Sequence, residues 1–268
     1  MLPAGERRRA ADGSSCLNLD AYYLAGFLPF ILVGFGAQLV DGALGMAFGV
    51  ISTTLLVSRG LDPAAASASV HVVEVFTTGA SGISHSLHKN VNWRLFRRIA
   101  IPGVIGGALG AYVLTLAAGR AKPFVLAYLA AIGLYLLWRG LRHAHQEKKP
   151  RIVEPLGLIG GFLDAAGGGG WGPVVTSNLL VQGAHPRKVI GTVNTAEFFV
   201  TATISATFIL SIGWSVFTQA MGGLLIGGLA AAPLGGFAAK KIPPRALLVL
   251  VGVLLIATSG YGIWKALS

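Results

Sequence analysis

The stretch DAAGGGGWGPVVTSNLL, from Asp164 to Leu180, constrains the fold more than any other part of the chain. It lies between strongly apolar segments, yet it contains a carboxylate, four consecutive glycines and a proline. A backbone that breaks in such surroundings must find hydrogen-bond partners where water is scarce. Within a membrane, irregular backbone is tolerated only where it is buried in protein or lines a cavity. The sequence therefore predicts an interrupted helix inside a membrane protein.

A related pattern begins at Asp41, which lies 123 positions before Asp164. The segment DGALGMAFGVISTTLL aligns with the later stretch without a gap, and the match continues until Glu74 pairs with Glu197. We interpret the chain as an internal duplication, which decides how the rest is interpreted. Broken hydrophobic segments at corresponding positions of two halves are the best sequence indication of a transporter binding site.

Composition places the chain among polytopic membrane proteins. It is 54% hydrophobic and 12% charged, whereas soluble domains carry about 25% charged residues. The net charge of +11 sits in short loops between apolar runs, as charge that sets membrane topology does, and not in a nucleic-acid patch. We predict an all-α polytopic membrane protein. About eight transmembrane helices, each needing roughly 20 residues, form two repeated four-helix modules, each with a broken, Gly-rich helix near the midplane.

Four regions follow from this pattern. We predict a cytoplasmic, uncleaved N-terminal lead at 1–20, a first transmembrane repeat at 21–138, a basic linker at 139–154 and a second repeat at 155–268. Basic residues favour a cytoplasmic N-terminus, on the same side as the Lys89–Arg98 loop and the linker. This assignment of the N-terminus to the cytoplasmic side requires each broken segment to cross the membrane an odd number of times. Two crossings per broken segment would place the N-terminus on the opposite side. Cys16 is the only cysteine, so we expect no disulfide and no metal or other cofactor.

The second break favours an anion site. Pro173 suits the first position of a helix, so a half-helix is predicted to start near Gly172. Free backbone N–H groups and the positive end of the helix dipole then bind an anion. The alternative is that the glycines only permit close helix packing.

Four carboxyl groups fall inside apolar segments, and such groups are functional candidates because burying them is costly. Glu74 and Glu197 are the predicted proton-coupling residues. Asp41 and Asp164 either bind substrate or cap the half-helices. On predicted helices, His71, Glu74 and Thr78 share one face, as do Asn194, Glu197 and Thr201. The predicted substrate-binding residues are Gln38, Asp41, Ser52, Thr53, His71, Asp164, Gly168, Gly169, Gly170, Trp171, Gly172, Thr176, Ser177, Asn178 and Asn194; the hydroxyls among them alternatively bond to their own helix.

These features resemble the TauE/SafE family of sulfite and organosulfonate exporters. The resemblance rests on VDGALGMAFG and LDAAGGGGWGP, the loops GLDP and GAHP, and the helix starts ASVHVVEVF and GTVNTAEFF. It covers about Ala21 to Trp264, although the first module lacks the glycine run and has Val50 opposite Pro173. The family implies export of sulfite, sulfoacetate or a related anion across the cell inner membrane.

The residues themselves imply only a secondary transporter of a small anion, accompanied by protons because no Lys or Arg sits firmly inside a span. The alternative is an importer, or a cation-coupled carrier, of a small organic acid. An intramembrane zinc enzyme is disfavoured, since no HExxH motif occurs and His71 is the only histidine placed deep in a span; the chain is expected not to be an enzyme. A purely structural membrane subunit would not explain the repeated carboxylates. The expected partners are the anionic substrate and the lipid bilayer, with no nucleic acid, and a homodimer stays open.

Overall fold

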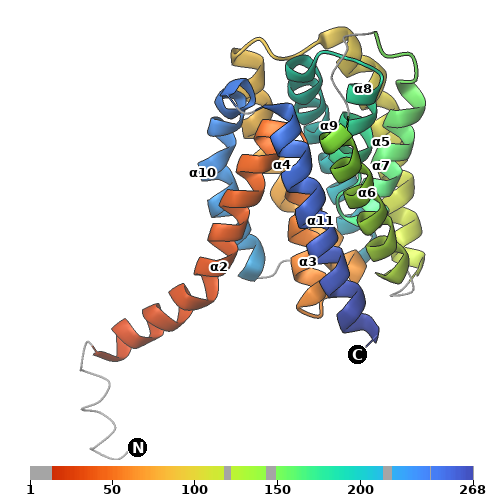
Figure 1. Cartoon of the computed structure of the whole chain (residues 1–268). Coiled ribbons are helices and arrows are strands. Elements are labelled where there is room, and N and C mark those ends of the chain that lie inside the picture. The colour runs from red at the N-terminus through yellow and green to blue at the C-terminus, as the bar shows by residue number, and fades with distance from the viewer. Residues whose placement is uncertain (1–13, 118–121, 143–148, 214–218, 242, 268) are drawn as a thin grey trace, which may run out of the picture.

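The computed structural model describes residues 14–117, 122–142, 149–213, 219–241 and 243–267. Within these ranges every regular element is helical (Figure 1), which confirms the all-α prediction. The helices are α2 (Ser14–Leu44), α3 (Phe48–Ser58), α4 (Pro63–Leu87), α5 (Trp93–Ala117), α6 (Lys122–Arg142), α7 (Glu154–Gly167), the π-helical turn η1 (Gly172–Thr176), α8 (Ser177–Val181), α9 (Pro186–Ile212), α10 (Gln219–Lys241) and α11 (Pro244–Leu267).

Four helical stretches in the described ranges are long and apolar enough to cross a membrane: Phe27–Leu44, Trp93–Leu116, Pro186–Ile212 and Ala220–Ala239. Helix α3 is apolar but shorter. The count of eight transmembrane segments therefore stays a prediction. The span that was expected to start at Trp214 begins outside the described residues, and α10 is described from Gln219 onward.

The predicted Gly-x-x-Pro loops explain where α4 and α9 begin. Gly60 and Gly183 both have positive φ, at 98° and 90°, which glycine adopts without a Cβ penalty. Each loop ends at a proline in the first turn of the next helix, where its missing N–H removes no hydrogen bond. In α4 the Asp62 side chain also accepts a hydrogen bond from the Ala64 N–H at 2.9 Å.

The broken segments are hairpins that return to the side from which they enter. In the first hairpin, formed by α2 and α3, the Arg59 guanidinium after α3 lies 5.7 Å from the centre of the Phe30 ring near the start of the apolar part of α2. In the second hairpin, formed by α7, η1 and α8, the Gln182 side chain donates to the carbonyl oxygen of Ile152 at 2.9 Å. Neither hairpin crosses the bundle, so the alternative in which the N-terminal side is reversed agrees with the structure.

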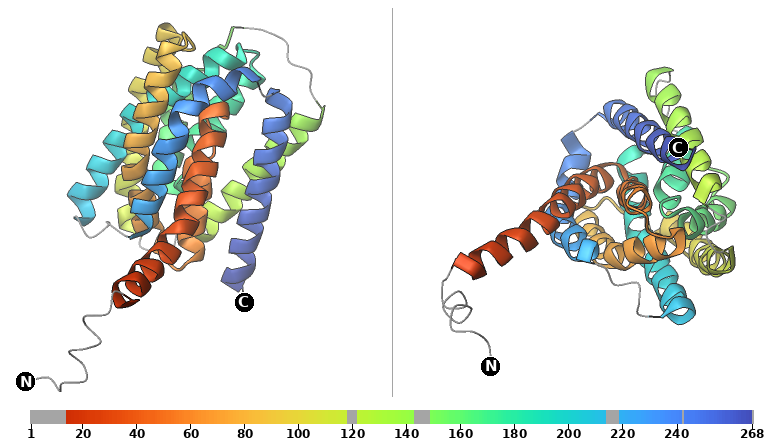
Figure 2. Two further views of the ribbon diagram at one scale, coloured as in Figure 1. Left: turned by 90° about the vertical axis from the view of Figure 1, so that its left-hand side faces the viewer. Right: turned by 90° about the horizontal axis from the view of Figure 1, so that it is seen from below.

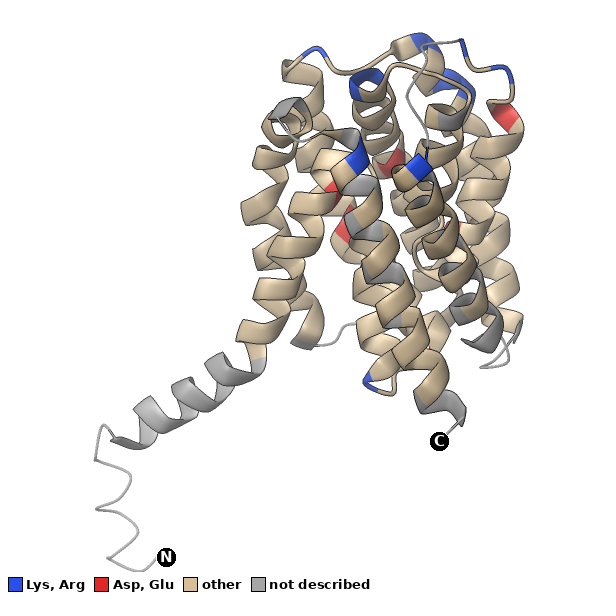
Figure 3. Cartoon of the chain, in the orientation of Figure 1, with Lys and Arg blue, Asp and Glu red and all other residues tan. Residues whose placement is uncertain are grey.

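The two hairpins enter the bundle from opposite ends (Figures 1 and 2). Helix α2 rises from the end where α11 finishes, whereas α7 descends from the end that carries the Lys89–Arg98 segment. Figure 3 shows that most of the coloured Lys and Arg residues gather at this second end, while Asp and Glu lie mainly in the middle of the bundle. The expectation that the N-terminus shares a side with the Lys89–Arg98 segment was wrong for the described start of α2, because it assumed odd crossings.

Long helices pack against both hairpins. Helix α2 packs along α10, and α7 packs along α5, while α4 and α9 lie against each other and α6 packs on α11 (Figure 2). The α2–α10 and α5–α7 contacts are close because glycines face the opposite backbone; Gly42 meets Gly235 and Gly161 meets Gly103. Small residues at helix contacts are the usual means of bringing backbones together in a membrane. The hairpin tips are thus held in the interior of the bundle.

Candidate functional site

The tips of the two hairpins meet. Gly45 and Gly168, which end the incoming helices, have the same φ of 66°. The Thr176 hydroxyl of the second hairpin donates to the Gly45 carbonyl oxygen at 2.7 Å. Gly169 lies so close to Val50 that a Cβ on it would overlap the Val50 backbone nitrogen. The predicted substrate-binding glycines and threonines are therefore brought together, with both half-helices starting at a common point.

Each aspartate at a break caps the half-helix that follows it. The Asp164 Oδ1 atom accepts a hydrogen bond from the Trp171 N–H at 3.1 Å. The Asp41 carboxyl accepts one from the Phe48 N–H in the same way. A carboxylate at this position satisfies an orphan donor and complements the helix dipole. Of the two interpretations of these aspartates, capping is the one seen in this conformation, so the first N–H groups of the half-helices are already bonded.

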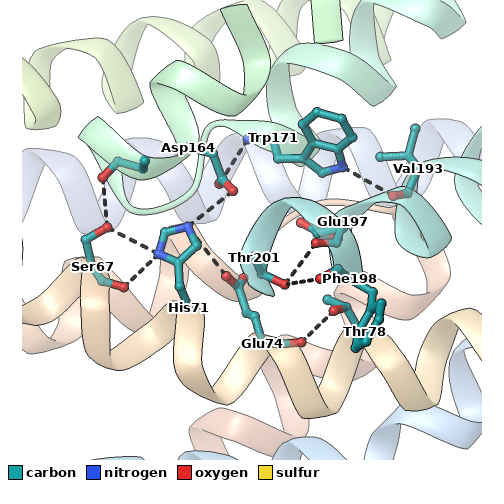
Figure 4. Close-up of polar contacts among 11 residues, drawn as sticks. Ser67, His71, Glu74, Thr78, Asp164, Trp171, Val193, Glu197, Phe198 and Thr201 are labelled. Carbon is teal, nitrogen blue, oxygen red and sulfur yellow. Dashed lines mark hydrogen bonds and ion pairs between the residues drawn. The ribbon is translucent and has the colours of Figure 1, made fainter. Parts of the chain in front are cut away.

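His71 links helix α4 to the second hairpin (Figure 4). Its Nε2 atom lies 3.2 Å from Asp164 Oδ2 and 3.9 Å from Glu74 Oε2. Its Nδ1 atom lies 2.7 Å from the Ser67 carbonyl oxygen. The Ser67 hydroxyl donates to the Ala165 carbonyl oxygen at 2.8 Å, so it fastens the same helix to the end of α7. His71 and Asp164, placed 93 residues apart in the sequence, form a direct contact.

Asn194 occupies the corresponding place on α9. Its Nδ2 atom lies 3.3 Å from the Asp41 carbonyl oxygen and 3.4 Å from the Ile190 carbonyl oxygen four residues earlier. Its Oδ1 atom accepts a hydrogen bond from the Ser81 hydroxyl of α4 at 2.9 Å. Asn194 thus joins the first hairpin to α9 as His71 joins the second hairpin to α4.

The four predicted carboxyl groups converge around the tips and are shielded from solvent. Asp41, Glu74, Asp164 and Glu197 are 1%, 2%, 2% and 4% exposed, respectively. They interact electrostatically with one another, and the Glu74 carboxyl accepts a hydrogen bond from the Gly49 N–H. Four buried acidic groups within mutual reach cannot all be charged without large cost. The cluster is therefore a candidate site for proton binding.

Several predicted binding residues present buried polar atoms without a hydrogen-bond partner in the described structure. Both side-chain polar atoms of Gln38, the hydroxyls of Ser52 and Thr53, and one carboxyl oxygen each of Asp41, Glu74 and Glu197 are in this state. Buried polar groups are normally satisfied, so unsatisfied ones are candidates for contact with water or a ligand. These residues belong to α2, α3, α4 and α9.

Other predicted residues serve the scaffold. The Ser177 hydroxyl donates to the Pro173 carbonyl oxygen of its own helical segment, and the Asn178 amide donates to the Val174 carbonyl oxygen at 2.8 Å. Both follow the alternative of back-bonding to their own helix. The Trp171 ring is buried against Gly103, and its Nε1–H donates to the Val193 carbonyl oxygen at 3.2 Å. Gly170 and Gly172 lie against Leu163 and Met46, where a side chain would not fit.

Sequence reasoning missed His85 and Ser67. His85 was placed at the end of a span, but it is fully buried, because α4 continues to Leu87 and the first hairpin packs on it. Its Nε2 atom lies 2.9 Å from the Gly42 carbonyl oxygen, and its Nδ1 atom lies 3.1 Å from Asn90 Nδ2. The available signal was periodicity, since Ser67 and His85 extend the polar face of His71 and Glu74 at helical spacing.

A cavity of about 580 Å³ opens at the basic end of the bundle. Arg94, Arg98, Lys149 and Lys188 line it together with the loop that follows α8, and none of its lining residues is acidic. Arg98 also bonds to Glu154 in a two-pronged ion pair, with N–O distances of 2.6 and 3.0 Å. The cavity lies where the second hairpin enters the bundle and favours anions.

Comparisons with known proteins identify the family of the chain. A family model described as "Sulfite exporter TauE/SafE" matches residues 30–262. The chain belongs to the TauE/SafE family. This TauE/SafE protein is also 45% identical over 246 residues to "Probable membrane transporter protein YtnM" of Bacillus subtilis (strain 168), across 85% of the chain and 80% of that relative. The predicted family is thereby confirmed, and the chain is a membrane transporter by family. No solved structure matches it.

Proposed function

We propose that this protein is a secondary transporter that exports a small anion, sulfite or an organosulfonate such as sulfoacetate, across the cell inner membrane in a proton-coupled manner. The observation that carries the proposal is the convergence of four buried carboxyl groups on the paired hairpin tips. A buried site with this many acidic groups accommodates an anion only if protons accompany it. The family description supplies the class of substrate.

We further propose that the two halves are modules of inverted orientation, α2–α6 and α7–α11. Supporting this are the opposite directions of the hairpins and the matched packing of α2 on α10 and α7 on α5. Inverted repeats with broken helices at their interface place substrate sites near the midplane of many transporters. The basic end of the bundle is then the cytoplasmic side, and the cavity there is the entrance for the anion.

We attribute the proton coupling to the Asp164 carboxyl group that caps the second half-helix. While Asp164 is ionised, its charge offsets the positive end of the half-helix at Trp171, and a second anion is repelled. Protonation leaves the hydrogen bond from Trp171 in place but removes the charge. An anion is then stabilised by the half-helix ends and by the unsatisfied polar atoms of Gln38, Ser52 and Thr53. Glu74 and Glu197 provide two further buried carboxyl groups that take up protons in this mechanism.

Flux measurements in proteoliposomes test the function. Sulfite, sulfoacetate and acetate are supplied with and without an imposed pH gradient. We expect saturable flux of sulfite or sulfoacetate that a pH gradient accelerates, with Glu74→Gln and Glu197→Gln reducing the acceleration. Asp62→Asn, which neutralises an exposed carboxylate outside the cavity and keeps a side chain able to cap α4, is the matched control. Flux of acetate alone, or flux that follows a sodium gradient at constant pH, would instead support the organic-acid carrier.

A further inference from the structure

The hydrogen bonds around His71 fix which of its ring nitrogens exchanges a proton. The Nδ1 atom lies 2.7 Å from the Ser67 carbonyl oxygen, which can only accept, so Nδ1 carries a hydrogen. The Ser67 hydroxyl donates its hydrogen to the Ala165 carbonyl oxygen. Its oxygen lies 3.2 Å from Nδ1 and can therefore act only as an acceptor there. Both contacts hold Nδ1 protonated. The protonation state of the imidazole is therefore decided at Nε2.

The Nε2 atom faces two carboxyl groups from different helices. Asp164 Oδ2 of α7 lies 3.2 Å away, and Glu74 Oε2 of α4 lies 3.9 Å away. On the α9 side the ring faces Phe208, at a centroid distance of 6.3 Å. The remaining titratable groups that interact with these carboxyls are Asp41 of α2 and Glu197 of α9. No Lys or Arg is among the groups that the structure records around this cluster, so His71 is its positive partner when protonated.

We propose that the His71–Asp164 pair is the proton-exchange site of this transporter, with Glu74 as the second acceptor; this inference rests on the proposed proton-coupled function. In one state the imidazolium Nε2–H donates to the Asp164 carboxylate. In the other state this proton has left Nε2, either onto Asp164 or Glu74 as a carboxylic acid, or to water when the site opens. The imidazole is then neutral with its Nδ1–H unchanged, and each transfer moves one proton and no electrons.

Protonation of this pair also affects the start of the half-helix in the second hairpin. Asp164 uses Oδ2 toward His71 and Oδ1 toward the Trp171 N–H, so one carboxyl group contacts both the imidazole and the start of the half-helix. A proton that settles on Asp164 weakens the charge that caps this half-helix. The first hairpin has no equivalent, because Asn194 stands in the place of His71 and cannot titrate. Proton exchange through a histidine is therefore confined to one of the two hairpins.

A spectroscopic experiment tests the pair without any substrate. The protein labelled with ¹⁵N-histidine is reconstituted in liposomes, and its ring nitrogens are followed by solid-state NMR from pH 5 to 9, with the His71 signals identified by their loss in His71→Asn. We expect Nδ1 to stay protonated and Nε2 to titrate. Asp164→Asn should shift that titration clearly more than Asp41→Asn, because only Asp164 contacts the His71 ring directly. An Nε2 atom that keeps one protonation state throughout, or equal shifts from both asparagine variants, would overturn the proposal.

A transport experiment then tests the role of the pair. With one exchanging proton, the initial rate of sulfite flux in wild type should change by up to about tenfold per pH unit. In His71→Asn, which copies Asn194, the sulfite flux should be lower than in wild type, and its change from pH 6 to 8 should be at least about twofold smaller, because asparagine does not titrate. His71→Asn flux with the wild-type pH dependence would refute the assignment. Absence of sulfite flux in wild type would refute the proposed function, while the NMR result would still decide whether the pair exchanges a proton.

Discussion

The His71–Asp164 contact and the Asn194–Asp41 contact occupy equivalent places in the two halves, but their chemistry differs. In both, a side chain on a long helix lies near the carbonyl oxygen four residues earlier and also reaches the hairpin of the other half. In the second hairpin the partner is the Asp164 carboxyl group, whereas in the first hairpin it is the Asp41 main-chain carbonyl. One contact can exchange protons, and the other is fixed.

The residues around these two contacts also differ between the two halves. Ser67, which holds the His71 ring, corresponds to Ile190 in the other half. The Thr176 hydroxyl is bonded to Gly45, whereas the hydroxyl of its counterpart Thr53 has no partner in the described structure. The backbone, in contrast, is kept, with equal φ at Gly45 and Gly168. In the proposed mechanism, hairpin tips of similar backbone geometry therefore carry the proton-exchange pair in one half and unsatisfied polar atoms in the other.

The largest expected effect comes from Gly169→Ala. Gly169 has a φ of 152° and lies against the Val50 backbone, whereas its counterpart Met46 carries a side chain in the first hairpin. A methyl group at this position forces the tips apart, and we expect a loss of more than about 3 kcal/mol of stability. Thermal melting in detergent and the yield of monodisperse protein measure it. Gly36→Ala, where the added Cβ meets open space, is the control and should stay near wild type; a wild-type melting temperature for Gly169→Ala would show that the tips are not in contact.

The next effect separates the two aspartates. Asp164→Asn removes the acidic partner of His71, whereas Asp41→Asn leaves Asn194 bonded to the main chain. Because the Asp164 carboxyl contacts both the His71 ring and the Trp171 N–H, we expect sulfite flux to fall at least about tenfold further in Asp164→Asn than in Asp41→Asn. Initial rates in proteoliposomes with matched protein content measure this ratio. Equal losses would mean that the two hairpins contribute alike and that the asymmetry seen here has no functional weight.

A smaller difference is expected between Glu74→Gln and Glu197→Gln. Glu74 lies 3.9 Å from His71 Nε2 and bonds to the Gly49 N–H. Glu197, which has an unsatisfied carboxyl oxygen as Glu74 does, is not among the carboxyl groups recorded within 4 Å of His71 in the described structure. Removing the nearer acid should reduce the pH dependence of flux about two- to threefold more than removing the farther one. The ratio of rates at pH 6 and pH 8 in each variant measures this. A larger effect of Glu197→Gln would place the proton path on α9 instead of α4.

Much of this arrangement could be predicted from the sequence because the two segments that break match each other without a gap. The gapless match fixed the positions of both breaks, and the structure restarts its helices at Phe48 and Gly172, close to the predicted point. The buried carboxyls and the polar faces of α4 and α9 followed from helical spacing. Helical periodicity does not show whether a segment crosses the membrane or turns back. A run of apolar residues followed by glycines is equally consistent with crossing or returning, and only the Arg59–Phe30 and Gln182–Ile152 contacts distinguish the two.

The hydrogen-bond partner of each polar side chain could also not be predicted from the sequence. Asp41 and Asp164 were equally good ligands or caps until the Phe48 and Trp171 N–H groups were seen to bond to them. Ser177 and Asn178 resembled binding residues, but their hydrogen bonds close on their own helix. His85 was overlooked because a histidine at the end of a hydrophobic run is normally at the membrane surface. It became buried only through the packing of the first hairpin, a tertiary contact.

The smallest effect concerns the outer contact between α5 and α7, where the halves differ again. The Arg98–Glu154 ion pair joins these helices at the basic end, whereas Gly223 of α10 packs on Phe30 and Ile31 of α2 without charges. Arg98 lowers the pKa of the exposed Glu154 below its usual value of 4.5. A lowered pKa means that the contribution to stability is present above about pH 4.5 and disappears as the pH falls through the pKa of the folded protein. We expect Glu154→Gln to lower the melting temperature by only about 1–2 °C at pH 7, and less below pH 4. Melting curves at the two pH values measure this, with the neighbouring exposed Arg97→Gln as control, and an equal deficit at both would mean that the contact acts through packing instead of charge.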